Sequence, residues 1–333
     1  MKQIDVKENE AGQRLDKLLS KYLNKAPKSF IYKMLRKKNI TLNDRKADGS
    51  EKTKLGDQVK IYLSDETFEK FSEQKVIAVS QEAKSGKKTS KLEIVYEDDN
   101  ILLMNKESGM LVQKASPKDY SLNDAMLDYL IEQGTVTEET LRTFKPSICN
   151  RLDRNTSGLV AAGKSLAGLQ ELSRMFKDRT MHKYYRCYVA GNVKSPSYVK
   201  GYLIKDEKNN QVTVLDKISN LDDKVEAKPI ETEYRPIYAG EDYTLLEVRL
   251  ITGRTHQIRA HLAYIGHPII GDTKYGNKRV NEKYQKQCNI KSQLLHGYRL
   301  EFPELTGKLA YLSGKKFVAP VPKEFKRMER LGQ

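Results

Sequence analysis

The spacing of hydrophobic residues changes character twice along this chain. Over residues 14–23 and 29–38, apolar side chains recur at the spacing of a helix with one buried face. Short alternating runs at 39–43 and 58–63 predict the strands of a hairpin. We therefore expect residues 1–65 to form a small α/β module of two helices and a hairpin.

Residues 66–90 lack this pattern, because polar residues dominate and large apolar residues are few. Segments of this kind bury too little apolar surface to offset the cost of ordering the chain. We predict a flexible linker here. The module would then be tethered to the rest of the chain rather than packed against it.

Residues 91–329 carry regular patterns again, and these predict one large domain. Alternating strands predominate, and turn signals separate them at Gly191, Gly201 and Gly240. Helices are interspersed, one beginning with a capping-box pattern at Ser121 and another at Ser165. Strands and helices do not alternate regularly, which argues against a doubly wound parallel sheet. The expected class is α+β, with a mostly antiparallel mixed sheet flanked by helices and loops.

The charge of the chain narrows the choice of partner. The 333 residues carry a formal net charge of +16, and a surplus of this size attracts polyanions because binding releases their condensed counterions. Nucleic acid is therefore the expected partner, and a merely solvated basic surface is the alternative. The second predicted helix concentrates positive charge on one face, through Lys28, Lys33, Arg36, Lys37 and Lys38.

Membrane insertion and secretion are not expected. No apolar run approaches the ~20 residues of a transmembrane helix, and residues 1–6 lack the apolar block of a signal peptide. We therefore expect a cytoplasmic protein, and a monomer. The cysteines fit no zinc or redox spacing, so we expect reduced packing residues at Cys149, Cys187 and Cys288.

The first candidate for chemistry is Asp153, which lies between Arg151 and Arg154 in a stretch rich in turn formers. We expect both arginines to bind the substrate. Apolar runs at 147–149 and 159–162 predict a strand on each side of this loop. A carboxylate in such a loop can point out of the sheet into a groove. This stretch alone leaves open the alternative of a structural aspartate in a turn.

The second candidate is the stretch 252–259, where a strand ends in Thr252-Gly253 and a helix begins at Gln257. His256 and Arg259 are three residues apart and are expected to be neighbours at the start of that helix. Backbone donors there, helped by Arg254, would attract an anion. We expect His256 to position a partner by hydrogen bonding.

A metal site is not expected in this region. The candidate metal ligands here are His256, His261, His267 and Asp272, and their spacing matches no zinc motif.

Tyr185 shares one face of the alternating strand 183–189 with Cys187 and Val189. Two interpretations of this tyrosine are open. It is either a residue of the core, or an aromatic ring that stacks on a nucleobase while its hydroxyl stays hydrated.

Taken in chain order, these motifs resemble the RluA-type RNA pseudouridine synthases. The resemblance spans nearly all of 92–303, through Arg151-Leu152-Asp153-Arg154 with Thr156-Ser157-Gly158, Lys183 with Tyr185 and Gly191, the run 252–262, Gly266-His267-Pro268, Gly271-Asp272, Tyr275-Gly276 and Leu294-Leu295-His296. The small basic module resembles the S-four-type RNA-binding domain, named after a small-subunit ribosomal protein. The two together are similar to the branch of the family that modifies ribosomal RNA.

The resemblance implies the pseudouridine synthase fold and an isomerisation that needs neither cofactor nor metal. Uracil is detached from its ribose, turned and reattached through carbon five. Asp153 would be the essential carboxylate, acting as nucleophile or as base, and Arg259 would keep it ionised. The other implied roles are stacking on the target base for Tyr185, filling the space of the extruded uridine for Arg151, and lining the base pocket for Leu295, with Ile258 completing its apolar floor.

Two positions depart from the family pattern. Asn150 stands where histidine is usual, and Glu107 stands where proline is usual. The first departure concerns RNA contacts, and the second concerns a turn.

The expected substrate is ribosomal RNA of the large subunit. Two alternatives are open: transfer RNA as the substrate, and a non-catalytic RNA-binding or ribosome-assembly factor that keeps the fold. The presence of Asp153, Arg259 and Tyr185 together favours the enzyme.

Overall fold

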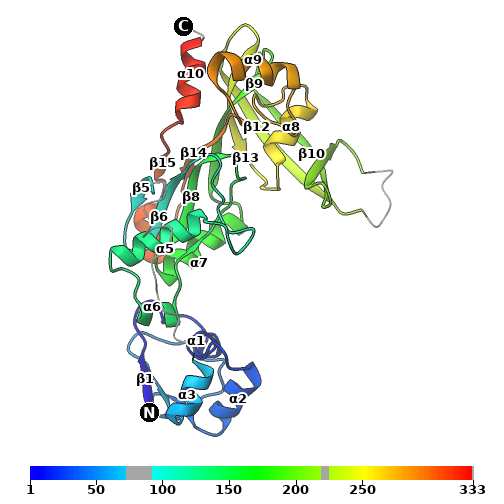
Figure 1. Ribbon diagram of the computed structural model, residues 1–333. Helices are drawn as coiled ribbons and strands as arrows, with labels where there is room; N and C mark the ends of the chain where they lie inside the picture. The colour runs from blue at the N-terminus through cyan, green and yellow to red at the C-terminus, as the bar shows by residue number, and fades with distance from the viewer. Residues whose placement is uncertain (73–91, 219–224, 332–333) are drawn as a thin grey trace.

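The computed structural model describes residues 1–72, 92–218 and 225–331. A small module lies at one end of the molecule and a large domain makes up the rest (Figure 1). Both contain helices and β-sheet, and the large sheet is mixed. The α+β class expected from the sequence is therefore confirmed.

The small module is a four-stranded antiparallel sheet with helices packed on it. The strand order is β1-β4-β2-β3, and the predicted helices are present as α1 and α2. Strand β1 was missed, because its four residues gain their structure by pairing with a partner more than fifty positions away. The bounds are β1 (Lys2–Asp5), α1 (Leu15–Tyr22), α2 (Lys28–Arg36), β2 (Ile40–Leu42), β3 (Arg45–Lys46) and β4 (Gln58–Ile61).

The first part of the predicted linker is a helix, so the prediction of a flexible segment from residue 66 is wrong there. Helix α3 (Asp65–Phe71) begins at Ser64, whose hydroxyl accepts the backbone N–H of Thr67. Phe68 is buried in the core of the module, and Phe71 packs on that core, its ring 4.2 Å from that of Phe30. Two aromatic residues at helical spacing outweighed the polar composition around them. The rest of the predicted linker, residues 73–91, lies outside the described residues.

The module contacts the large domain directly, which the expectation of a loose tether did not include. The hydroxyl of Thr143, at the end of α6 (Glu138–Thr143), donates a hydrogen bond to the buried carboxylate of Glu10. The backbone N–H of Leu166 donates to Asn9 Oδ1 at 3.1 Å. Helix α6 lies beside α1 at this junction (Figure 1). Such contacts join single polar residues and leave no periodic signal in the sequence.

The large domain is built on one mixed sheet, with eleven strands in the part of the chain that the structure describes. The order along the sheet is β11-β10-β12-β13-β9-β14-β8-β6-β5, while β15 pairs with β14 and β7 with β8. All pairings are antiparallel except that of β8 with β14. The bounds are β5 (Ile94–Glu97), β6 (Ile101–Lys106), β7 (Ser147–Ile148), β8 (Ser157–Gly163), β9 (His182–Ala190), β10 (Ser197–Asp206), β11 (Gln211–Leu215), β12 (Ala227–Ala239), β13 (Tyr243–Leu250), β14 (Leu295–Glu301) and β15 (Lys316–Val318).

The strand β6 is apolar at consecutive positions because both of its faces are covered. Ile101 and Leu103 pack under α7 (Leu166–Lys177) and the 3-10 helix η1 (Gly307–Leu312). Leu102 and Met104 pack on the opposite face, under α5 (Leu122–Glu132). A strand covered on both sides reads as a continuous hydrophobic run rather than an alternating one.

Three further helices cover the other half of the domain (Figure 1). Their bounds are α8 (Gln257–Tyr264), α9 (Lys278–Cys288) and α10 (Lys323–Leu331). Helix α8 packs Ile258 and Leu262 on the sheet beside Tyr185 and Val248. Of the residues that the structure describes, none form a helix that is both long and apolar enough to cross a membrane.

The two halves of the sheet meet where β8 runs parallel to β14. Gly158 lies alongside Gly297 there, and a Cβ on Gly158 would lie 2.3 Å from the carbonyl oxygen of Gly297. Only glycine permits such an approach, and the φ of 116° at Gly158 favours it as well. The loop that precedes Gly158 carries Asp153, so this junction places that carboxylate between the two halves of the sheet.

Candidate active site

Asp153 lies in the loop between β7 and β8, as the sequence predicted. The loop closes on itself through a hydrogen bond from the backbone N–H of Thr156 to the carbonyl oxygen of Asp153, at 3.0 Å. The side chain of Asp153 is 27% exposed. Its carboxylate is therefore held by its surroundings and still reachable from a cleft.

The end of β6 and the turn that follows it are hydrogen-bonded to the backbone of this loop. The ammonium of Lys106 donates to the carbonyl oxygens of Glu107, Met110 and Arg154, each at 2.9 Å. Ser108 Oγ donates to the carbonyl of Asn155 at 2.9 Å. Burial lowers the pKa of Lys106 to about 7, but three carbonyl acceptors match the three N–H bonds of the charged form. Glu107, which replaces the usual proline, belongs to this turn through its carbonyl.

Asn150, the other departure from the family pattern, ties the start of the loop to β8. Its side-chain amide donates to the carbonyl of Leu159 at 3.2 Å, and its oxygen accepts the N–H of Ala161 at 2.7 Å. The side chain of Asn150 therefore bonds to backbone groups of β8 just beyond the point where the pairing with β7 ends. This position supports the loop, in addition to lining the pocket.

Arg259 and Asp153 are brought together from 106 residues apart in the chain. Arg259 Nη1 donates to Asp153 Oδ2 at 2.9 Å, and the arginine side chain is only 7% exposed. Arg259 also binds Asp272, through Nε at 2.7 Å and Nη2 at 3.0 Å. Burial opposes the charge on Arg259, yet its bonds to Asp272 and Asp153 outweigh that effect and raise the pKa of the guanidinium.

Asp272 is completely buried, with 0% of its side chain exposed. Burial disfavours its charge, but hydrogen bonding and attraction to Arg259, together with the backbone N–H groups of Lys274 and Tyr275, lower the pKa of this carboxyl. Asp272 is thus a permanent anion that fixes the plane of the guanidinium. From the sequence, Asp272 was considered as a metal ligand and counted in the family motif, but this role was not predicted.

His256 approaches Asp153 from the N-terminus of α8, with 3.8 Å between Nε2 and Oδ2. Its Nδ1 lies 2.9 Å from the hydroxyl of Tyr275, which in turn accepts the backbone N–H of Val212 at 2.9 Å. A hydroxyl that accepts from Val212 is free to donate to Nδ1, which leaves the proton of the neutral ring on Nε2, facing Asp153. Burial lowers the pKa of His256, and the neutral form is favoured.

Gln257 fixes the loop that leads into α8. Its side-chain oxygen accepts the hydroxyl of Thr252 at 2.8 Å and the backbone N–H of Arg254 at 3.1 Å. Its amide nitrogen donates to the carbonyl of Glu231 and the hydroxyl of Thr232 on β12. These bonds hold His256 in a left-handed conformation, with φ of 55°. Gln257 was counted in the motif, but its function was not anticipated.

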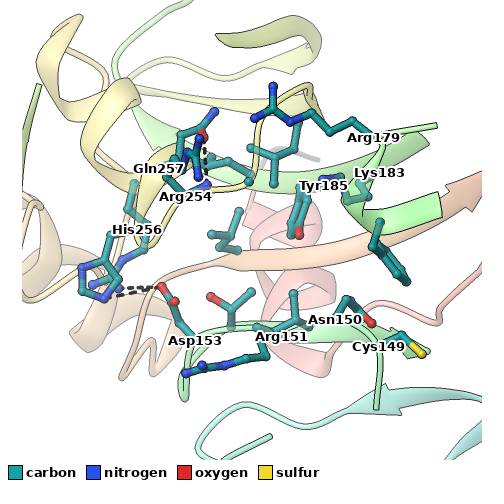
Figure 2. Close-up of a pocket in the computed structure, with 18 of the residues that line it drawn as sticks. Cys149, Asn150, Arg151, Asp153, Arg179, Lys183, Tyr185, Arg254, His256 and Gln257 are labelled. Carbon is teal, nitrogen blue, oxygen red and sulfur yellow. Dashed lines mark hydrogen bonds and ion pairs between the residues drawn. The ribbon is translucent and has the colours of Figure 1, made fainter. Parts of the chain in front are cut away.

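A cavity of about 430 Å³ opens beside Asp153, a volume within the range of small-ligand sites. Figure 2 shows Asp153 and Arg151 along one side of it and Tyr185 facing them. Ile258 and Leu295 line it as well. Tyr185, Ile258 and Leu295 belong to one buried cluster of the core, so both interpretations of Tyr185 apply to the same ring.

The cavity contains most of the predicted site residues, but not all of them. Arg151, Arg254 and His256 line it together with Asp153 and Arg259. Arg154 is not among the lining residues, and its Nε donates instead to the carbonyl of Gly109 at 3.1 Å. Its prediction as a substrate-binding residue gains no support from this geometry. Three cationic lining residues were not assigned a site role from the sequence: Lys177, Arg179 and Lys183.

The cysteines and remaining histidines are not gathered at a metal site. All three cysteines are free; Cys187 and Cys288 are buried, whereas Cys149 is partly exposed and lines the cavity. His261 and His267 bond to Thr232 and to the carbonyl of Ala190. Across the described residues, no three His, Cys, Asp or Glu side chains lie close enough together to hold a metal ion.

Comparison with known proteins agrees with the motifs. The sequence model of a family described as RNA pseudouridylate synthase matches residues 100–264. A ribosomal large subunit pseudouridine synthase C from Vibrio parahaemolyticus is 34% identical over 307 residues, which cover 90% of this chain and 87% of that protein. The protein of the same name from Pasteurella multocida is 31% identical over 338 residues, which cover 98% and 93%.

A solved structure shares the fold. Human RNA Pseudouridylate Synthase Domain Containing 4 aligns with a TM-score of 0.57 and 21% sequence identity, over 72% of this chain and 92% of that one. Sequence identity above 30% along nearly the full length of the bacterial relatives goes further than the fold and establishes membership. This chain belongs to the RluA-type family of RNA pseudouridine synthases, and it is an isomerase that converts uridine in RNA to pseudouridine.

Proposed function

We propose that Asp153 is the catalytic carboxylate of this isomerase and that Arg259 pairs with it and orients it. The observation that carries this assignment is the 2.9 Å ion pair of Asp153 and Arg259 at the edge of the cavity. Arg259 is itself held by the buried Asp272, so the position of the positive charge does not depend on substrate. Asp153 then reaches the ribose of a bound uridine either as nucleophile or as base.

The remaining lining residues receive roles that match their surroundings. Tyr185 stacks on the target base, because its ring lies in an apolar wall formed with Ile258 and Leu295. Burial raises the pKa of the Tyr185 hydroxyl above its ordinary value, so it stays protonated beside Asp153. Arg151 is exposed at the rim and has no bonding partner among the described residues, so it is free to occupy the space of an extruded base.

The substrate we propose is ribosomal RNA of the large subunit, and the relatives named above support this choice through what their names state. The N-terminal module would add affinity for that RNA. Its cationic side chains, Lys28, Lys33, Arg36, Lys37 and Lys38, are all exposed on or just after α2. Phosphate contacts of this kind are salt-dependent. Transfer RNA is the competing substrate.

The catalytic assignment is tested with Asp153→Asn, which keeps the shape of the side chain and removes its charge. Formation of pseudouridine displaces the hydrogen at carbon five of uracil, so tritium release from RNA labelled at that carbon measures turnover. We expect no turnover in Asp153→Asn and RNA affinity within about twofold of the parent. Asp99→Asn, at an exposed aspartate in the turn between β5 and β6, is the matched control and should be fully active. Turnover by Asp153→Asn would remove the assignment.

The substrate is tested by mapping pseudouridines in a strain that lacks this protein. We expect at least one uridine of large-subunit ribosomal RNA to lose its modification and to regain it with the parent protein but not with Asp153→Asn. Loss confined to transfer RNA would select the competing substrate. A deletion of residues 1–72, which removes α3 with the rest of the module, should weaken RNA affinity and reduce its salt dependence; unchanged values would reject an RNA role for the module.

A further inference from the structure

The side chains that line the cavity beside Asp153 carry more positive charge than the carboxylate of Asp153 can balance. Asp153 is the only carboxylate among the lining residues, and Arg259 is occupied by Asp153 and Asp272. Five other cations line the cavity without an ion pair to any residue in the described ranges: Arg151, Lys177, Arg179, Lys183 and Arg254. Like charges gathered in one cleft repel one another, and an anion from outside would relieve that repulsion.

Lys183 is partly buried, whereas Arg151, Lys177 and Arg179 are exposed. It lies near the start of β9 and lines the cavity. Its ammonium forms no hydrogen bond with the part of the chain that the structure describes. A Cβ on Gly253 would lie 3.4 Å from Lys183 Nζ, so the ammonium lies against the loop that carries Arg254. Burial, and then repulsion by Arg179, lower the pKa of Lys183. Holding this charge at the cavity wall therefore carries a free-energy cost.

Arg254 and Arg179 reach the same side of the cavity from two other elements. The backbone N–H of Arg254 is fixed by Gln257, but its Nε is buried and has no partner within the described residues. Arg179 follows α7 in a left-handed conformation, with φ of 61°, which is strained for a residue with a side chain. Figure 2 shows Arg179, Lys183 and Arg254 on the side of the cavity opposite Asp153 and Arg151, with Tyr185 between the two sides.

We propose that Lys183, Arg179 and Arg254 form a phosphate-binding subsite for the RNA backbone next to the uridine held by Tyr185. The subsite rests on the function proposed above, because it takes the base position from Tyr185. A nucleotide whose ring stacks on Tyr185 and whose ribose faces Asp153 carries a phosphate on each side of that ribose. One of the two would meet three cations, and guanidinium and ammonium groups are the usual partners of phosphate.

The test uses direct binding of small nucleotides, which does not require turnover. Uridine, uridine 5′-monophosphate and uridine 3′-monophosphate are titrated into the full chain, and their dissociation constants are compared. Hydrogen bonds from charged groups to phosphate are stronger than neutral ones, so at least one monophosphate should bind roughly tenfold tighter than uridine or better. Whether the 5′ or the 3′ ester gains identifies which phosphate occupies the subsite.

The variants assign the gain to the three cations. Lys183→Gln should reduce the advantage of the monophosphate over uridine to near one, while the affinity for uridine stays within twofold. Lys183→Arg, which keeps the charge, should retain most of the advantage. Arg179→Gln, in an exposed turn where folding is not at risk, should reduce it as well. Lys286→Gln removes one exposed lysine from α9, outside the cavity, and should change nothing.

Two results would overturn the subsite. One is equal affinity of the parent protein for uridine and both monophosphates. The other is a full phosphate advantage in Lys183→Gln and Arg179→Gln. The catalytic assignment is judged separately by turnover of Asp153→Asn. A failure of that assignment therefore leaves the binding experiment readable, and a failure of the subsite leaves the role of Asp153 intact.

Discussion

Asp272 binds two nitrogens of Arg259, Nε at 2.7 Å and Nη2 at 3.0 Å, and leaves Nη1 to face Asp153. The arginine therefore joins two carboxylates with different tasks. The buried one fixes the guanidinium, and the partly exposed one is free to react. This division predicts that catalysis depends on a residue that never touches RNA.

Asp272→Asn tests that dependence. The substitution keeps the shape of the side chain but removes the charge from a fully buried ion pair, and breaking such a pair costs about 3–5 kcal/mol. We expect a lower thermal midpoint and a fall in kcat of at least about tenfold, which corresponds to 1.4 kcal/mol in the barrier. The KM for RNA should stay within about twofold, since Asp272 is shielded from the cavity. Steady-state kinetics decide the matter, and an unchanged kcat would show that Arg259 holds its position without Asp272.

Lys106→Met should loosen the catalytic loop from behind. The substitution removes the donor of three partly buried hydrogen bonds, and a carbonyl left unpaired away from water costs about 1–3 kcal/mol. We expect a loss of unfolding free energy of a few kcal/mol by urea titration and a reduced kcat, because one of the carbonyls belongs to Arg154, next to Asp153. Lys286→Met, at an exposed lysine, controls for the loss of charge. Parental stability in Lys106→Met would mean that the loop has other sufficient support.

His296 should make the stability of the protein depend on pH between about 4 and 6.5. This histidine is fully buried between Ser157 Oγ and the carbonyl of Ala319, and burial lowers its pKa from 6.5 to about 4. In that window the unfolded chain binds the proton and the folded protein does not, so stability falls as pH falls. The difference between the folded and unfolded pKa values corresponds to roughly 3 kcal/mol at most.

The measurement compares urea unfolding of the parent protein with that of His296→Gln at pH 7 and pH 4.5. The glutamine variant should be less stable at pH 7, because glutamine does not fill the buried space of the imidazole ring. It should lose less stability on acidification, because glutamine does not bind a proton. An equal loss in both proteins would assign the acid sensitivity to other groups.

Thr143→Val should loosen the contact between the N-terminal module and the large domain without disturbing either core, because it removes one of the hydrogen bonds at their junction. Valine has the shape of threonine but cannot donate to the buried carboxylate of Glu10. We expect the distance distribution between spin labels on the two parts to broaden. The KM for RNA should rise several-fold while kcat stays within about twofold. Thr143→Ser, which keeps the donor, should behave as the parent does; if valine leaves both the distances and KM unchanged, the contact does not orient the module.

The sequence predicted the elements and motifs well, because helices, strands and turns follow from local spacing. The two helices of the module, the loop of Asp153 and the helix that begins at Gln257 are all present where the pattern indicated. The prediction failed at α3, where polar residues surround Phe68 and Phe71 and the helix is stabilised by packing on the module rather than by its own composition.

Only the tertiary structure decided which distant residues meet. The pairing of Asp153 with Arg259 was expected from the family resemblance, but the hold of Asp272 on that arginine, the three bonds of Lys106 and the contact of Thr143 with Glu10 were not. The physical reason is that sequence spacing reports the face of a helix or strand, whereas these contacts depend on the order of strands in the sheet. The parallel pairing of β8 with β14 joins the two halves of the sheet, and the candidate active site lies beside this junction.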